Sequence, residues 1–281
     1  MKRIIDPLRE LGVEIESRNE CLPLKIIPHI LTGITYTSPV ASAQVKSSLL
    51  LAALQAEGPT TIYQPAHSRD HSERMLRKLG IDVQSTANSV RLHPNGRPLP
   101  PTNLTVPGDF SSAAFLIAAA VLVPGSNVHI RGIGVNSTRT GLLDMLSAMG
   151  ADISIENRRE RGGEPVADIT ARHSRLRAVK VRGELVVRMI DEFPVFAVMA
   201  TQAEGTTTVK DASELRVKES NRISALASEL GQMGVSITER PDGFVVSGPQ
   251  QLSAATVDSQ SDHRLAMSLA IAAMLADGES N

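Results

Sequence analysis

The sequence repeats one pattern of helix and strand signals along its length. Four amphipathic runs each end in a glycine and are followed by a β-type stretch; these glycines are Gly12, Gly80, Gly150 and Gly234. Four alanine-rich runs alternate with them and also close on glycine, at 47–58, 113–125, 195–205 and 265–278. A glycine directly after a helix supplies the left-handed conformation that ends it. Repeating about every 70 to 80 residues, the pattern predicts units of strand, helix, strand, helix and two strands.

The repeat predicts an α/β (α+β) fold whose alanine-rich helices are buried. Such helices can be almost wholly apolar when other elements surround them. Strands are expected directly after the first three alanine-rich runs, at 60–63, 127–130 and 206–209. Further strands are expected ahead of the first two runs, at 35–40 and 104–106.

A proline-rich segment at 95–101 is the best candidate for a linker between two domains. With 281 residues, the chain is long enough for two domains with cores of their own. We therefore expect one lobe at 1–102 and a second at 103–281. Within the second lobe, the charged, glycine-containing stretch 157–165 predicts a solvated hairpin loop rather than a nucleic-acid patch.

Both ends of the chain fall inside a repeat unit. The chain begins on an amphipathic run with no alanine-rich half before it, and it stops at Asn281, where the fourth unit should enter a strand. This pattern predicts a fragment, or one piece of a split protein with a complementing N-terminal polypeptide. We expect the isolated chain to be inactive or nearly so.

Composition excludes several classes of function. The chain is 42% hydrophobic and 21% charged with a net charge of −1, which is typical of a globular protein without a polyanionic or membrane-surface partner. Aromatic residues make up only 2%, which argues against base-stacking on nucleic acid. The longest apolar run, 113–123, is about half a membrane span. Cys21 is the single cysteine, so a reducing, cytoplasmic location is expected.

Polar residues precede every alanine-rich run. They are Ser42-Ala43-Gln44, Gly108 to Ser112, Asp191-Glu192 and Asp262-His263-Arg264. Helix capping accounts for Asp109 and Ser111 but not for Gln44, the Asp191-Glu192 pair or His263-Arg264. Helix N-termini offer free N–H groups and a positive dipole end, so converging N-termini would form a cleft for phosphates and carboxylates.

The stretch 215–222, Leu-Arg-Val-Lys-Glu-Ser-Asn-Arg, would supply charges to such a cleft. On a helical turn, Lys218 and Arg222 share one face and Glu219 meets Arg222. The alternative is a solvated helix face for this stretch and a charged helix cap for Asp262-His263-Arg264. Arg69 and Arg264 would add further positive charge, and Asp191 and Glu219 would be proton-transfer groups. The sequence contains no glycine-rich phosphate loop. His67 and His71 have a helical spacing that would allow a metal site, but no further ligand cluster accompanies them. We therefore expect proton transfer between phosphorylated small molecules without a metal.

Six ordered segments make the chain resemble the 5-enolpyruvylshikimate-3-phosphate synthase family. They lie at 42–47, 69–76, 106–113, 190–194, 216–222 and 262–267. The resemblance implies a two-lobed enolpyruvyl transferase fold of repeated strand–helix–strand–helix–strand–strand units. It implies transfer of the enolpyruvyl group of phosphoenolpyruvate to the 5-hydroxyl of shikimate 3-phosphate, through a tetrahedral adduct and without a metal or cofactor.

The resemblance also implies roles for individual residues. Shikimate 3-phosphate would contact Ser42, Ala43, Gln44, Arg69, Asp191 and Lys218. Asp191 would accept the hydroxyl proton, and Glu219 would transfer a proton at the enolpyruvyl methylene. Phosphoenolpyruvate would be held by Gln44, Arg222 and Arg264, with His263 beside them.

The chain lacks parts of the family pattern. An early Lys-Ser pair with an Arg, an Asn-Ala-Gly-Thr loop, an Arg-Pro pair and a late lysine are missing, which leaves about two thirds of the enzyme. A non-catalytic fragment or half-enzyme is therefore one alternative. UDP-N-acetylglucosamine enolpyruvyltransferase, which shares the fold and the donor, is another, although 217–222 and 262–264 favour the shikimate enzyme and Cys21 does not fit the rival's reactive loop.

Overall fold

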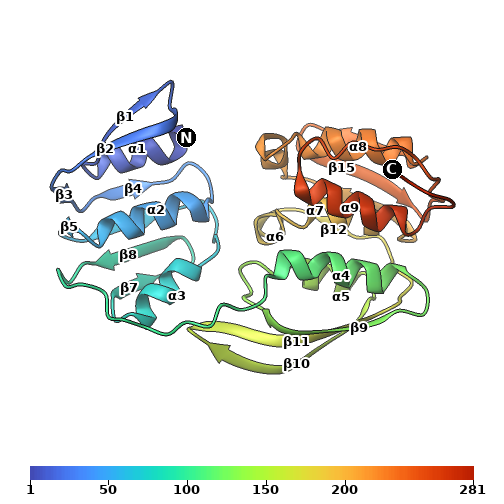
Figure 1. Ribbon diagram of the computed structural model, residues 1–281, viewed down its shortest axis with the longest axis horizontal. Coiled ribbons are helices and arrows are strands. Elements are labelled where there is room, and N and C mark those ends of the chain that lie inside the picture. Colours follow the sequence, from blue (N-terminus) through green and yellow to red (C-terminus); the bar gives the residue numbers. More distant parts are fainter. The chain divides into compact units, whose positions relative to one another are not determined.

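The computed structural model describes residues 1–281 and divides into two compact units (Figure 1). Unit 1 comprises 1–106 with 161–164, and unit 2 comprises 107–160 with 165–281. The chain passes from one unit to the other after residue 106, where the sequence predicted a boundary at 102. Figure 1 draws unit 1 in blue to teal, apart from the short hairpin tip at 161–164, and unit 2 in green to red.

Unit 1 consists of three helices and eight short strands. The helices are α1 (Lys2–Glu10), α2 (Ala43–Ala53) and α3 (His71–Lys78). The main sheet has the order β4-β6-β8-β7, formed by Thr35–Thr37, Thr60–Tyr63, Ser89–His93 and Asp82–Ser85. Two smaller pairs are β1 (Glu14–Arg18) with β2 (Cys21–Ile27), and β3 (Leu31–Thr32) with β5 (Ala56–Glu57). The core lies between α2, α3 and the main sheet, where Leu49, Leu76 and Ile62 are buried.

Unit 2 contains two sheets and a set of buried helices. The first sheet has the order β10-β11-β9, formed by Asp152–Arg161, Glu164–Arg172 and Asn127–Gly134. The second has the order β12-β13-β15-β14, formed by Lys180–Val181, Gly205–Val209, Gly243–Gly248 and Ile237–Arg240. The helices are α4 (Phe110–Leu122), α5 (Gly141–Ala148), α6 (Glu184–Arg188), α7 (Phe193–Thr201), α8 (Arg222–Gln232) and α9 (His263–Ala273), with a 3₁₀ turn at Ser213–Val217.

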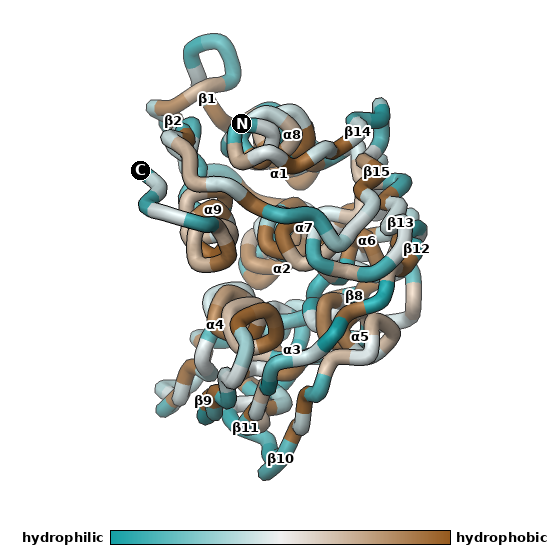
Figure 2. Tube along the Cα trace, turned by 90° about the vertical axis from the view of Figure 1, so that its right-hand side faces the viewer, coloured by the Kyte–Doolittle hydropathy of each residue, from teal (hydrophilic) through white to brown (hydrophobic).

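The alanine-rich helices form the centre of unit 2, as the repeat predicts. Every residue of α7 is buried, and α7 packs against both α4 and α9. Figure 2 shows α4 and α7 as apolar along most of their length. Phe193 meets Phe196 and Phe244 edge to face, with ring centroids 6.1 and 6.5 Å apart. This geometry is preferred by aromatic pairs and adds to the stabilisation from buried area.

Glycine ends the amphipathic helices as expected. Gly80 after α3 and Gly234 after α8 have φ of +83° and +85°, in the left-handed region that other residues rarely adopt. The strands predicted at 60–63, 127–130 and 206–209 are confirmed within β6, β9 and β13. None of the helices is long and apolar enough to cross a membrane.

One local prediction is wrong and another is confirmed only in part. The lead strand expected at 104–106 does not form, because Leu104 and Val106 are exposed and the first bridge to β9 comes later, from Gly108 to Ile133. The lead strand at 35–40 forms only over β4.

The stretch 157–165 is mostly strand rather than a solvated loop. Residues 157–161 belong to β10, and only Gly162 and Gly163 make the turn into β11. Asp168 on β11 holds the hairpin by accepting hydrogen bonds from the N–H of Gly132 and from Asn157 and Arg159. These three bonds hold the pKa of the Asp168 carboxyl well below its usual range. Charged residues are tolerated on β10 because it is the edge strand of its sheet.

Candidate active site

The candidate residues of unit 2 meet around the guanidinium of Arg222, the first residue of α8. This side chain is fully buried. Its Nε donates to Asp262 Oδ2 at 2.8 Å, and its Nη2 donates to Glu219 Oε2 at 2.6 Å. Its Nη1 lies 3.8 Å from Asp191 Oδ1 and has no hydrogen-bond partner. Arg222 therefore brings together the start of α8 with carboxylates that lie just ahead of α7, α8 and α9.

Asp262 caps helix α9, as the Asp-His-Arg sequence predicts. Its Oδ1 accepts from the backbone N–H of Arg264 at 2.9 Å and of Leu265 at 3.4 Å. Burial acts to raise the pKa of this carboxyl, but hydrogen bonds and charge from Arg222, together with the two backbone N–H groups, outweigh it and hold the pKa below its ordinary value. Asp262 is thus an ionised anchor for Arg222.

Asp191 lies between two guanidinium groups just before α7. Its Oδ1 is 3.8 Å from Arg222 Nη1 and its Oδ2 is 3.6 Å from Arg264 Nη2. Arg264 Nη1 also donates to the Asp191 carbonyl at 3.4 Å. The side-chain separations exceed hydrogen-bond length, so the attraction is coulombic. Because the Asp191 side chain is 18% exposed, a carboxylate flanked by two cations remains open to solvent.

Lys218 and Arg222 do not share a helical face, contrary to the sequence prediction. Lys218 closes the 3₁₀ turn in an extended conformation, and α8 begins only at Arg222. The break has a local cause, because Asn221 caps α8 by accepting the N–H of Ser224. Lys218 instead donates to Glu214 at 2.9 Å. The expected Glu219–Arg222 contact does form, and His263 is exposed at the first position of α9.

A second polar cluster in unit 2 escaped the sequence analysis. Asp109 caps α4 by accepting the N–H of Ser112 at 2.8 Å, as expected. Ser111, however, is not a cap: it is buried and donates to Glu192, the residue after Asp191. Arg139 donates to Asp109 at 2.7 Å and to Ser111 at 2.9 Å. Ser111 and Glu192 are far apart in the chain and Arg139 belongs to no motif, so only the fold reveals this cluster.

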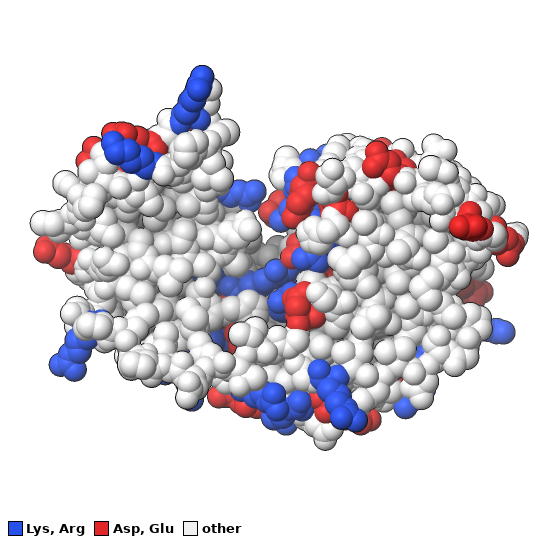
Figure 3. All heavy atoms as spheres, viewed as in Figure 1, with Lys and Arg blue, Asp and Glu red and all other residues white.

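Arg139 also contributes to a lowered pKa of the Asp109 carboxyl. Burial acts to raise the pKa of the Asp109 carboxyl, but the charge of Arg139 and the bonds from Ser112 outweigh it and lower the pKa. The starts of α4 and α7 are therefore joined by a chain of charged and polar contacts. Figure 3 shows acidic and basic side chains gathered side by side on the surface of unit 2.

The candidate residues of unit 1 lie at the start of α2 and ahead of α3. Ser42 caps α2 by accepting the N–H of Val45 at 3.4 Å, and Ala43 is the first helical residue. Gln44 is exposed on the first turn, and Arg69 is partly buried two residues before α3. Lys46, one turn further along α2, reaches the carbonyl of Ser68 at 3.4 Å. The two segments are therefore neighbours within unit 1.

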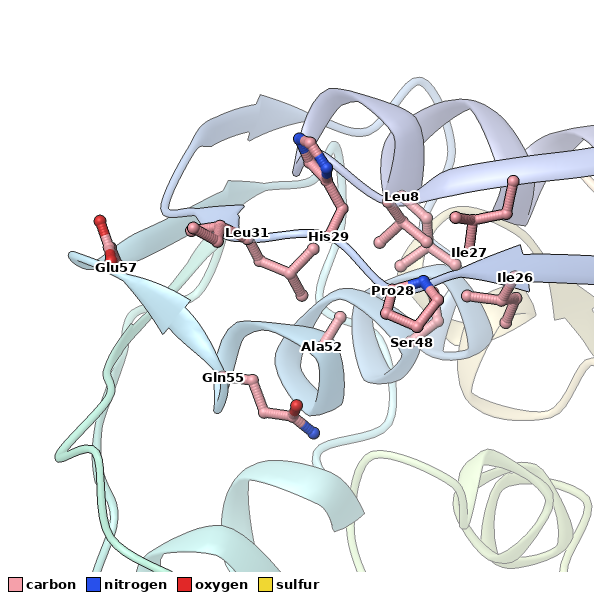
Figure 4. Close-up of a pocket in the computed structure, with 12 residues that line it drawn as sticks. Leu8, Ile26, Ile27, Pro28, His29, Leu31, Ser48, Ala52, Gln55 and Glu57 are labelled. Carbon is pink, nitrogen blue, oxygen red and sulfur yellow. The ribbon is translucent and has the colours of Figure 1, made fainter.

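A hollow of about 650 Å³ in unit 1 lies away from these residues (Figure 4). Mainly apolar side chains line it, including Leu8, Ile26 and Leu31, and it contains none of the predicted site residues. His67 and His71 are not part of a metal-ligand cluster, because no group of three or more His, Cys, Asp or Glu side chains comes together. His71 instead contacts Glu164, with Nδ1 2.8 Å from Oε1.

Residues 1–281 match the family described as EPSP synthase (3-phosphoshikimate 1-carboxyvinyltransferase). The chain belongs to this family. It is 51% identical to the 3-phosphoshikimate 1-carboxyvinyltransferase of Geobacter metallireducens, over 99% of this chain and 65% of that protein. It is 52% identical to the enzyme of the same name from Synechococcus elongatus, over 99% of this chain and 63% of that protein.

Solved structures agree with the family. EPSP synthase from Acinetobacter baumannii superposes with a TM-score of 0.87 at 42% identity, over 99% of this chain and 65% of that one. The enolpyruvyl transferase NikO from Streptomyces tendae gives 0.78 at 20% identity, over 98% and 64%, and shows the fold alone. The two-lobed α/β enolpyruvyl transferase fold predicted from the repeat and the resemblance is confirmed.

The chain spans a little under two thirds of the length of these relatives. The relatives at about 50% identity are named as the shikimate enzyme, so the UDP-N-acetylglucosamine alternative is not favoured. The comparisons give no support to a separate complementing polypeptide.

Proposed function

We propose that this chain carries substrate-binding and proton-transfer residues of a 3-phosphoshikimate 1-carboxyvinyltransferase. The reaction moves the enolpyruvyl group of phosphoenolpyruvate to the 5-hydroxyl of shikimate 3-phosphate and releases phosphate. The observation that carries the proposal is the Asp191 carboxylate between Arg222 and Arg264 at the start of a buried helix. A base flanked by two fixed cations suits a hydroxyl that attacks an anionic partner.

Asp191 is the group we assign to the acceptor hydroxyl. It takes the proton as the hydroxyl oxygen bonds to C2 of phosphoenolpyruvate. Glu219 delivers a proton to C3, which converts the methylene to a methyl group and completes the tetrahedral adduct. In the second step the C2–O bond to phosphate breaks and C3 returns a proton to the protein, so that an enol ether and inorganic phosphate leave.

The two arginines hold the donor. Arg264 is 16% exposed and offers its fork to a carboxylate or phosphate. Arg222 is buried, and its Nη1 is the atom that has no hydrogen-bond partner. Leaving a buried donor unpaired costs about 1–3 kcal/mol, so an anionic oxygen of phosphoenolpyruvate would relieve that cost on binding. His263, which is exposed beside Arg264, is assigned to the catalytic residues together with Asp191, Glu219 and Lys218.

Shikimate 3-phosphate is assigned to the α2 start, with Ser42, Ala43 and Gln44, and to Arg69, Lys218 and Asp191. A helix N-terminus and an arginine fork are both suited to a phosphate group. Gln44 is exposed and is also assigned to phosphoenolpyruvate. The proposal requires neither cofactor nor metal, and it places the enzyme in the cytoplasm.

The test is phosphate release measured with both substrates. We would assay the 281-residue chain and a fusion that supplies the remaining third from the Geobacter metallireducens relative. We expect little or no release from the 281-residue chain, and release from the fusion that depends on shikimate 3-phosphate and is lost in Arg264→Ala. Release with UDP-N-acetylglucosamine as the acceptor, or no release from the fusion, would refute the proposal.

A further inference from the structure

Unit 1 contains a fully buried ion pair that the proposed mechanism does not use. Lys46 Nζ on α2 lies 2.6 Å from Glu73 Oε1 on α3, and the two side chains are 1% and 3% exposed. The second carboxylate oxygen of Glu73 is buried without a hydrogen-bond partner. Buried apolar residues lie one helical turn further along each helix, Leu49 and Leu50 on α2 and Leu76 on α3.

A buried ion pair of this kind is a poor way to stabilise a core. Removing two charges from water costs about as much as their attraction returns, and apolar residues of similar size at the same place are often equally stable or more stable. The unpartnered oxygen of Glu73 adds to that cost. The pair therefore calls for an explanation other than stability, and its neighbours supply one.

Lys46 joins two segments that carry substrate-binding candidates. Its backbone N–H donates to the Ser42 carbonyl and closes the first turn of α2. Its ammonium donates at 3.4 Å to the carbonyl of the peptide that links Ser68 to Arg69. Ser47 and Ser72 make a second link between the same segments, with their hydroxyl oxygens 2.6 Å apart.

We propose that Lys46 and Glu73 are positioning residues that fix Arg69 relative to the start of α2, and so set the affinity for shikimate 3-phosphate. This inference rests on the proposed function. Glu73 fixes the ammonium from the first turn of α3, and the ammonium fixes the peptide next to Arg69. The Lys46 ammonium is held by Glu73 and by the Ser68 carbonyl, so the pair acts on Arg69 and on the start of α2 rather than on the substrate directly.

The test replaces the pair with apolar side chains of similar size, in Lys46→Met/Glu73→Leu. Thermal unfolding, shikimate 3-phosphate binding by calorimetry, and amide hydrogen exchange over residues 64–72 are measured on the 281-residue chain and on the fusion. We expect an unfolding temperature at or above that of the parent. We also expect affinity for shikimate 3-phosphate to fall about tenfold or more, because small misplacements of binding groups are costly, and exchange over 64–72 to become faster.

A matched control is available in the same unit. Lys25 and Glu16 form an ion pair at 3.0 Å with side chains 68% and 58% exposed. Lys25→Met/Glu16→Leu should leave both shikimate 3-phosphate affinity and exchange over 64–72 unchanged. Parent-like affinity in the buried double variant would overturn the inference.

Two further outcomes are decisive. If the double variant does not fold, Lys46→Arg keeps the charge but shifts the donor, and it should weaken shikimate 3-phosphate binding several-fold; unchanged affinity would overturn the inference. If the parent and the fusion bind no shikimate 3-phosphate, the proposed function fails. In that case hydrogen exchange alone tests whether Lys46 and Glu73 position the segment 64–72. Exchange over 64–72 that is as slow in the double variant as in the parent would overturn the inference.

Discussion

At the scale of single residues, Arg222 and Arg264 have the same proposed role in binding phosphoenolpyruvate but differ in burial and in their contacts. Arg222 is fully buried and bonded to Asp262 and Glu219, whereas Arg264 is 16% exposed and contacts Asp191. Removing one partner of a buried ion pair costs about 3–5 kcal/mol of stability. Arg222→Ala would therefore mix a loss of folding with a loss of binding, and Arg264 is the better position at which to test the anion clamp.

We predict that Arg264→Ala weakens phosphoenolpyruvate binding far more than shikimate 3-phosphate binding. The variant removes a charge-assisted contact worth about 1.5–3 kcal/mol and leaves the core intact. Separate binding titrations of the two ligands check it. Arg158→Ala, on the exposed side of β10, is the control and should change neither constant. Equal losses for both ligands in Arg264→Ala would contradict the clamp.

At the scale of elements, the starts of α4 and α7 are joined by the Ser111–Glu192 contact. We predict that Ser111→Ala lowers the free energy of unfolding by about 1–3 kcal/mol, because it removes a hydrogen bond from a buried carboxylate. Denaturant unfolding measures the change. Ser147→Ala, at an exposed position of α5, should stay near the parent value. An unchanged midpoint for Ser111→Ala would show that the contact does not join the helices.

The β10–β11 hairpin makes a prediction about pH. The pKa of Asp168 is lower in the folded than in the unfolded chain, so its contribution to stability is full above about pH 4 and is lost as pH falls toward the folded value. Asp168→Asn should therefore lose less stability than the parent on acidification from about pH 5 to about pH 3. Asp152→Asn, at a side chain 58% exposed, is the control. Equal acid sensitivity in parent and Asp168→Asn would contradict this assignment.

At the scale of the whole molecule, the sequence predicted the features that depend on residues close together in the chain. Glycine stops, buried alanine-rich helices and the Asp262 cap all follow from neighbouring residues, and the structure confirms them. It missed contacts that only the fold creates, such as Lys46 with Glu73 and Ser111 with Glu192. The sequence analysis also extended a helix back to Lys218, because charge spacing alone does not reveal that Asn221 caps α8 and that the helix begins at Arg222.

The account rests most heavily on Asp191 as the proton acceptor for the shikimate hydroxyl. Asp191→Asn keeps the size and shape of the side chain but removes the base. The measurement is kcat together with the binding constants of both substrates, in the fusion that carries the remaining third of a relative. We predict that kcat falls by about 10²- to 10⁴-fold while both binding constants stay within a few-fold of the parent. A near-normal kcat would remove Asp191 from the mechanism and leave Glu219 as the main proton-transfer group.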